Sequence, residues 1–185
     1  VRSSSMDSIS EATRDMRDAY ASGAPGMLVS ATTWLVAGLV LLRTGSTRSG
    51  VVTLFAGGML IFPLSVLVCK LLGRSGKHAR ENPLGPLALE STGLMIFSLP
   101  VAYAAFLLDA RWFFPAMMLI IGGRYLVFRS LYGLRLYWAC GASLALASYG
   151  VAALKLAPAY SAFVGAGLEA AFAVAILLTA RRSGA

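Results

Sequence analysis

Ionisable side chains inside long apolar segments are the residues of this sequence that could do chemistry. Glu169 stands in a run of glycine and alanine from Gly165 to Ala171, and Arg124 follows Gly122 and Gly123. A charge in the hydrocarbon of a bilayer costs at least ~2.5 kcal/mol even on lenient scales. Such residues usually pair with one another or line a path for ions or protons.

A second group of charges lies nearer one predicted face of the membrane. Glu90 is about one turn into an apolar segment, and Arg129 and Arg135 bracket the turn between two later segments. Two interpretations stay open for both groups. The charges either form salt bridges and reach the headgroups through long arginine side chains, or Glu169 and Glu90 line a polar pathway.

The residues that bind metals or cofactors are scarce. The chain has one histidine, His78, and two cysteines, Cys69 and Cys140, without paired spacing, and both cysteines fall inside predicted spans, where a disulfide is not expected. A glycine-rich phosphate loop, a nucleophile elbow and an HExxH motif are missing. The sequence predicts no catalytic residue, no metal site and no cofactor, so catalysis would depend on isolated carboxylates.

Composition indicates the elements that position these charges. Apolar residues make up 58% of the chain and charged residues 13%, with a mean hydropathy of +0.74. A spanning helix needs ~20 mostly apolar residues. Six such windows fit without overlap, at residues 24–42, 51–72, 87–108, 113–131, 133–154 and 159–180. Continuous apolar runs argue against a β-barrel. The sequence predicts an all-α transmembrane bundle of six spans over residues 23–182.

The N-terminal segment, residues 1–22, precedes the first span. Ser8 and Glu11 have the spacing of a capping box, and Ile9, Met16 and Tyr20 fall near one stripe of a helix. We predict a short amphipathic helix over residues 8–20, which either lies on the membrane surface or packs beneath the bundle.

The positive charges predict the orientation. Twelve of the sixteen lysines and arginines fall on one predicted face, and four fall on the other, namely Arg43, Arg48, Arg111 and Lys155. Positive loops stay in the cytoplasm. We therefore expect a multi-pass protein of the bacterial inner (plasma) membrane with both termini cytoplasmic. The net charge of +8 then needs no nucleic-acid partner.

Several residues indicate how the helices bend and pack. Gly57, Gly58 and Pro63 in the second span and Pro100 in the third predict kinks. Small residues four apart around Glu169 predict that this side of the last span faces inward. Six aromatic residues near the span ends are interpreted as interfacial anchors: Trp112, Phe113, Phe114, Tyr132, Tyr137 and Trp138.

Internal duplication is a further possibility. Arg43 and Lys70 bracket the second span much as Arg129 and Lys155 bracket the fifth. Two halves of three spans would be inverted repeats, a signature of transport folds. Chance similarity between apolar segments is the other explanation.

Three stretches carry a resemblance. GGMLIFPLS from Gly57 to Ser65, CKLLGRSGKH from Cys69 to His78 and GGRY from Gly122 to Tyr125 resemble an uncharacterised family of small bacterial multi-helix membrane proteins, a domain of unknown function. The resemblance covers most of the chain from the first span to the fifth. It implies a small helical bundle in a bacterial inner membrane and brings no assigned activity, ligand or catalytic residue.

Three functions are compatible with these features. The first is a small transporter or channel with a polar path past Glu169 and Arg124. The second is a non-catalytic module that binds a lipid, a peptide or a partner membrane protein through the loop from Lys70 to Arg80 and the N-terminal surface helix. The third is an intramembrane lipid-modifying enzyme that uses Glu90 or Glu169 as general acid or base. The expected partners are membrane lipids and either another copy of the chain or a partner membrane protein.

Overall fold

Seven α-helices and two short 3-10 turns make up the described part of the chain. The computed structural model describes residues 8–182, with side chains through residue 180. The elements follow in the order α1 (Ile9–Tyr20), η1 (Ala21–Gly23), α2 (Ala24–Thr44), α3 (Thr47–Leu71), α4 (Gly85–Leu108), η2 (Ala110–Trp112), α5 (Phe113–Tyr132), α6 (Leu136–Ala153) and α7 (Pro158–Arg182).

Six of these helices, α2 to α7, are long and apolar enough to cross a membrane. The described residues contain no strand, so the prediction of an all-α bundle with six spans and a short N-terminal helix is confirmed. The protein is therefore a multi-pass membrane protein by length and composition of its helices. Large apolar side chains on α3 and α4 are widely exposed, as expected of helices that face lipid.

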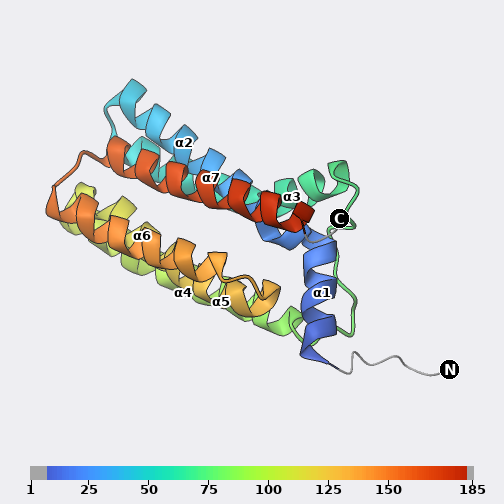
Figure 1. Cartoon of the computed structure of the whole chain (residues 1–185). Coiled ribbons are helices and arrows are strands. Elements are labelled where there is room, and N and C mark those ends of the chain that lie inside the picture. The colour runs from blue at the N-terminus through green and yellow to red at the C-terminus, as the bar shows by residue number, and fades with distance from the viewer. Residues whose placement is uncertain (1–7, 183–185) are drawn as a thin grey trace.

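The spans form two layers (Figure 1). In the first, which we name the α2 layer, α2 lies between α3 and α7 and packs against both. In the second, the α5 layer, α5 lies between α4 and α6. The layers touch mainly where α7 meets α5 and α6. A side chain buried at this contact can therefore interact with helices of both layers.

The packing pattern repeats after three helices. The helices α2 and α5 are each preceded by a 3-10 turn, carry a proline near their start (Pro25 and Pro115) and end at a glycine with φ of 63°, Gly45 and Gly133. Each also packs against the helix that follows it, and against one helix from the other half of the chain. Three spans per half give the two halves opposite directions, which is the arrangement of an inverted repeat.

The helix α1 lies across one end of the bundle, the end that also holds the last turn of α7 (Figure 1). Ser8 caps it, because its hydroxyl accepts the backbone N–H of Glu11 at 3.3 Å. Its buried stripe consists of Ala12, Met16 and Ala19, whereas Ile9 is 75% exposed. Of the two predicted positions, α1 therefore takes the one beneath the bundle.

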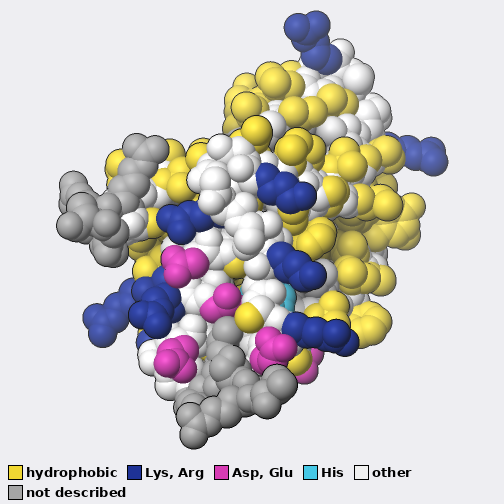
Figure 2. Space-filling model, turned by 90° about the vertical axis from the view of Figure 1, so that its right-hand side faces the viewer, with side chains coloured by type: hydrophobic (Ala, Val, Ile, Leu, Met, Phe, Trp, Pro, Cys, Tyr) yellow, Lys and Arg dark blue, Asp and Glu magenta, His cyan; other side chains and the backbone are white. Residues whose placement is uncertain are grey.

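The segment after α3, residues 72–84, is bound to α1. Asp15 Oδ2 accepts the backbone N–H of Ala79 at 2.9 Å and the amide of Asn82 at 2.7 Å. The Asn82 amide also donates to the Ala12 carbonyl, and the Gly76 N–H donates to the Ala19 carbonyl, both at 2.9 Å. Acidic side chains of α1 thus lie among the basic residues at this end (Figure 2). We name this surface the α1 end.

The corner between α1 and α2 is held in a sparsely populated conformation. Ala21, Ser22 and Gly23 all have positive φ, at 47°, 57° and 81°. The Tyr137 hydroxyl donates to the Ser22 carbonyl at 2.6 Å, and a Cβ on Gly23 would lie 2.4 Å from that hydroxyl oxygen. A residue with a side chain does not fit at position 23, so α1 is fixed to α6 through this corner.

Four of the six aromatic residues assigned to the membrane interface are instead in the core. Phe113, Phe114 and Tyr137 are fully buried and Tyr132 is 7% exposed, so the interpretation as anchors is wrong for these four. Trp112 and Trp138 are about half exposed. The four buried rings pack against neighbouring aromatic rings near the helix ends. Their positions in the sequence show that they lie near the helix ends, but not whether they face the lipid or the core.

Candidate functional site

Glu169 is enclosed at the contact between the two layers. It lies eleven residues after the start of α7, or ~16 Å along the helix, and its side chain has no exposed surface. The Tyr125 hydroxyl of α5 donates to Glu169 Oε1 at 2.8 Å. Glu169 Oε2 has no hydrogen bond of normal geometry to any described residue, although the Ser30 hydroxyl of α2 interacts with the carboxyl. Three helices therefore meet at this carboxyl.

Small residues on α7 allow this enclosure. A Cβ on Gly165, one turn before Glu169, would lie 2.9 Å from the Trp34 ring of α2. Alanine occupies positions 162, 166 and 173, and all three are buried. Because these positions repeat on one side of the helix, α7 presents a flat face to its neighbours, and Glu169 lies on that face. The prediction that this side faces inward agrees with its burial.

Tyrosines extend from Glu169 toward the α1 end. The rings of Tyr125 and Tyr137 lie 5.9 Å apart between centroids, and Tyr137 stacks on Tyr132 at 5.5 Å. The Tyr137 hydroxyl reaches the Ser22 carbonyl in the corner described above. Tyr125, Tyr137 and the Ser22 carbonyl thus place polar atoms, in sequence, between the carboxyl and the α1 end.

Polar atoms also lie on the other side of Glu169, toward the opposite end. Trp34 Nε1 and Ser161 Oγ are buried without a hydrogen-bond partner among the described residues. Ser161, Gly165 and Glu169 are spaced by four residues and share one side of α7, and Trp34 lies against Gly165. Buried polar atoms without partners are uncommon in folded proteins. Among the described residues, three of the six such side-chain atoms lie on α2 or α7, namely these two and Glu169 Oε2, and the other three lie on α4 and α5.

Arg124 lies at nearly the same depth as Glu169, but it faces the other way. Its guanidinium donates to Thr92 Oγ1 at 3.0 Å and to Met95 Sδ at 3.4 Å, both on α4, and lies 5.0 Å from the centroid of the Phe128 ring. Among the described residues no ion pair joins it to Glu169. The partly exposed arginine and the buried carboxyl therefore lie at similar depth and interact only through space, without an ion pair.

The remaining predicted site residues lie apart from Glu169. Glu90 is exposed on α4, and Arg135 is exposed just before α6. Arg129 is half-buried, and its guanidinium lies 5.1 Å from the centroid of the Trp138 ring. The structure does not gather these three into one cluster with Glu169.

The predicted kink positions lie in continuous helices. The helix α3 runs through Gly57, Gly58 and Pro63, and α4 runs through Pro100. Gly57 contacts Thr33 of α2 so closely that a Cβ would lie 2.3 Å from the threonine methyl group, whereas Gly58 faces open space. One of these glycines therefore serves close packing between α2 and α3.

The chemistry available at Glu169 is proton binding. Within residues 8–182 no group of three or more histidine, cysteine, aspartate or glutamate side chains could hold a metal ion. The carboxyl has a hydroxyl donor on one oxygen and a second oxygen open to a proton or to a hydrogen-bond donor. The hydroxyls of Tyr125 and Ser30 contact the carboxyl, and the buried thiol of Cys140 on α6 lies close enough to interact with it electrostatically.

Sequence reasoning missed Tyr125, Ser30, Tyr137 and Trp34. Tyr125 follows Arg124 directly, and consecutive residues of a helix point about 100° apart, so the charged neighbour drew the attention while the tyrosine faces α7. The available signal was a tyrosine in the middle of a span, where a hydroxyl needs a partner. Trp34 in the middle of the first span offered the same signal through its indole N–H. Ser30 carries no such signal, because small polar residues are frequent where membrane helices pack.

The fold and this site define a multi-pass membrane protein with an enclosed carboxyl between two three-helix layers. The chain belongs to a family of unknown function, DUF7010, whose model matches residues 9–179. The match runs from the start of α1 almost to the end of α7, so it includes both layers and the α1 end. None of the curated proteins and none of the solved structures matches the chain. The expected kinship with an uncharacterised family is confirmed.

Proposed function

We propose that this protein carries protons across the membrane, alone or together with a small solute, and that Glu169 binds the proton midway. The observation that carries this proposal is a fully buried carboxyl at the contact between the layers, which forms no ion pair with a described cation and whose Oε2 lacks a hydrogen bond to the described residues. Carboxyls in such positions are typical of proton pathways.

The charge state of Glu169 is the basis of the mechanism. An ionised carboxylate without a cation costs several kcal/mol in a dry interior, so the enclosed state favours the neutral acid. In the neutral form the protonated Oε2 can donate a hydrogen bond to the Ser30 hydroxyl oxygen. Opening the site to water on either side removes the penalty and allows the proton to leave.

Polar atoms on both sides of Glu169 support a path. Ser161 and Trp34 precede it from one end, and the hydroxyls of Tyr125 and Tyr137 follow it toward the α1 end. Unpartnered buried polar atoms are sites where internal water binds. Water at these positions would connect the carboxyl to each end in turn.

The two layers supply the conformational change. In transporters built from inverted repeats, sites lie near the middle of the membrane between the repeats, and one part rocks against the other. Glu169 belongs to the α2 layer and its hydrogen-bond donor Tyr125 to the α5 layer. Movement of one layer against the other would therefore break this hydrogen bond and expose the carboxyl.

Proton flux into proteoliposomes tests the proposal. With a pH-sensitive dye inside and a membrane potential set by potassium and valinomycin, we expect protein-dependent acidification that Glu169→Gln lowers at least ~10-fold. Glu90→Gln is the matched control, because it makes the same change on the exposed side of α4, and it should leave flux unchanged. Arg124→Gln should retain at least half of the flux. Equal flux for the parent protein and Glu169→Gln would overturn the proposal.

Infrared spectroscopy gives a second readout that needs no knowledge of a solute. A neutral Glu169 contributes a carboxylic C=O band that is absent from Glu169→Gln. If the carboxyl exchanges protons with water, the band shifts in heavy water and its intensity depends on the pH of the medium. A band that neither shifts nor titrates would identify Glu169 as a structural acid and refute its role as a carrier.

We also propose that the α1 end faces the cytoplasm of a bacterial inner membrane. Most described basic residues lie there, whereas Arg43, Arg48, Arg111 and Lys155 lie at the opposite end. Positive loops are retained in the cytoplasm. An impermeant thiol reagent added to intact cells should label a cysteine introduced at Thr47 and spare one introduced at Ser75. The reverse pattern would invert the orientation.

The other two functions have weaker support. For the partner-binding module, several polar groups of the segment 72–84 already form hydrogen bonds with α1, so fewer are available to bind a partner. Glu90 is exposed on α4 and makes no hydrogen bond or ion pair that would orient it as a general acid or base within the described chain. The carboxyl at position 169 remains the better candidate for an active group.

A further inference from the structure

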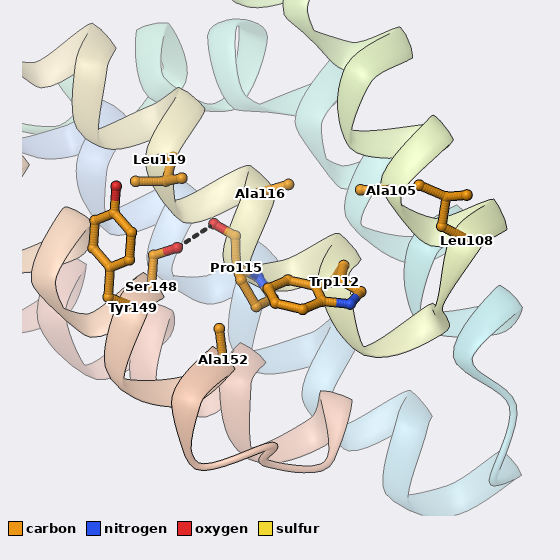
Figure 3. Close-up of a pocket in the computed structure, with 9 residues that line it drawn as sticks. All are labelled: Ala105, Leu108, Trp112, Pro115, Ala116, Leu119, Ser148, Tyr149 and Ala152. Atoms are coloured by element: carbon orange, nitrogen blue, oxygen red, sulfur yellow. Dashed lines mark hydrogen bonds between the residues drawn. The ribbon is translucent and has the colours of Figure 1, made fainter.

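An apolar groove opens between α4, α5 and α6 at the end opposite α1 (Figure 3). It has a volume of about 320 Å³ and is lined by Ala105, Leu108, Trp112, Pro115, Ala116, Leu119, Ser148, Tyr149 and Ala152. The one buried hydroxyl in its wall, that of Ser148, already donates to the Pro115 carbonyl at 2.8 Å. The groove therefore offers an apolar surface to whatever enters it.

A smaller polar pocket adjoins the groove. It measures about 200 Å³ and shares Trp112 and Ala152 with the groove, and its other lining residues are Asp109, Arg111, Val151, Ala153, Lys155 and Leu156. Because two residues line both spaces, the apolar groove continues into a charged mouth at the end of the bundle. One elongated molecule with an apolar tail and a polar head fits this sequence of surfaces.

The charge of the mouth is positive. Arg111 donates to both oxygens of Asp109, with its Nη2 at 2.6 Å from Oδ2. These hydrogen bonds hold the pKa of the Asp109 carboxyl down at about 2, so this pair stays ionised and neutral overall. Lys155 has no ion pair with a described acidic residue. Its backbone has a φ of 51°, and its N–H donates to the Ala152 carbonyl at 3.0 Å. One positive charge remains.

We propose that this composite site binds one anionic phospholipid, with an acyl chain in the groove and the phosphate at Lys155. The half-exposed indole of Trp112 lies where the two spaces meet and can donate to a headgroup oxygen. An acyl chain fits the apolar wall of the groove better than a peptide does, because the backbone polar groups of a peptide need hydrogen-bond partners in hydrocarbon and the Ser148 hydroxyl is already bonded. The surplus positive charge selects an anionic head over a zwitterionic one. This site is independent of proton transport through Glu169.

Quenching of Trp112 fluorescence tests the site. The protein carrying Trp138→Phe is reconstituted into bilayers in which either the anionic or the zwitterionic phospholipid, at equal mole fraction, has brominated acyl chains. The signal of Trp112 is the difference from the variant that also carries Trp112→Phe. We expect the anionic lipid to associate about fivefold more strongly, the usual effect of one surface cation, and Lys155→Gln to abolish that preference.

The control is Lys70→Gln, which removes one positive charge from the exposed surface at the α1 end and should leave the preference unchanged. Equal quenching by the two lipids would show ordinary bilayer lipid in the groove and overturn the proposal. Absence of quenching by both would show that protein covers the groove, and that also overturns it.

Discussion

Glu169 and Arg124 lie at similar depth on two helices that run in the same direction, yet their surroundings differ completely. Glu169 is sealed between the layers, with one hydrogen bond from Tyr125. Arg124 stays within the α5 layer, partly exposed, with two contacts to α4 and an aromatic ring beneath it. Depth alone therefore does not decide how a membrane charge is accommodated, whereas the side of the helix does.

The lengths of the two side chains explain part of this difference. An arginine can extend along apolar surface toward the headgroups and keep its charge near polar groups. A glutamate is too short for that from the middle of a span, so it depends on donors from neighbouring helices. Tyr125 and Ser30 are those neighbours. The glutamate is consequently the residue whose state depends on how the two layers meet.

A larger side chain at the contact of α7 with α2, beside Glu169, should have the largest effect on stability. Gly165→Ala places a Cβ 2.9 Å from the Trp34 ring, which is itself buried and has little room to move. We expect a loss of about 1–3 kcal/mol of folding free energy, the usual result of overpacking. The loss is measured as a lowered midpoint of thermal unfolding in detergent.

Gly167→Ala is the matched control for this experiment. Position 167 lies two residues further along the same helix, and a Cβ there meets nothing within 4 Å. Because alanine favours the helix over glycine, we expect this variant to be unchanged or stabilised by up to about 1 kcal/mol. Similar destabilisation by both alanines would indicate that α7 does not depend on its contact with Trp34, and the enclosure of Glu169 would need another explanation.

The spans were predictable because their signal is local. Apolar runs of the required length define the helices, and the observed bounds differ from the predicted windows by a few residues. The start of α6 moves from 133 to Leu136 because Gly133 ends α5 with positive φ. The position of α1 beneath the bundle depended on contacts with residues 72–84, which sequence spacing does not reveal.

The environment of Glu169 was predictable only in part. Glycine and alanine around it indicated an inward side, and depth along the helix indicated its distance from the ends. Its partner was not predictable, because Arg124 and Tyr125 share one depth and differ only in direction. That direction depends on which helix lies beside α5, and this is a property of the layered arrangement rather than of any single segment.

Removing the hydrogen-bond partner of Glu169 or of Arg124 should lower the folding free energy by less than Gly165→Ala does, and by different amounts at the two sites. Tyr125→Phe removes the hydroxyl that donates to the buried carboxyl at 2.8 Å, and we expect a loss of about 1–2 kcal/mol of folding free energy, at the upper end for hydrogen bonds in membrane proteins. Thr92→Val removes one acceptor from Arg124, which keeps its contact with Phe128, so about 0.5 kcal/mol is expected. Thermal unfolding gives the order of the two losses.

The infrared band of Glu169 distinguishes this hydrogen bond from general packing. Loss of the donor at Tyr125 should move the carboxyl C=O band to higher frequency, whereas Thr92→Val should leave it in place, since Thr92 contacts Arg124 on the α4 side. If both variants move the band, the two charges are coupled despite the absence of an ion pair in the described chain. The contrast between a charge held within one layer and a carboxyl shared by two would then no longer hold.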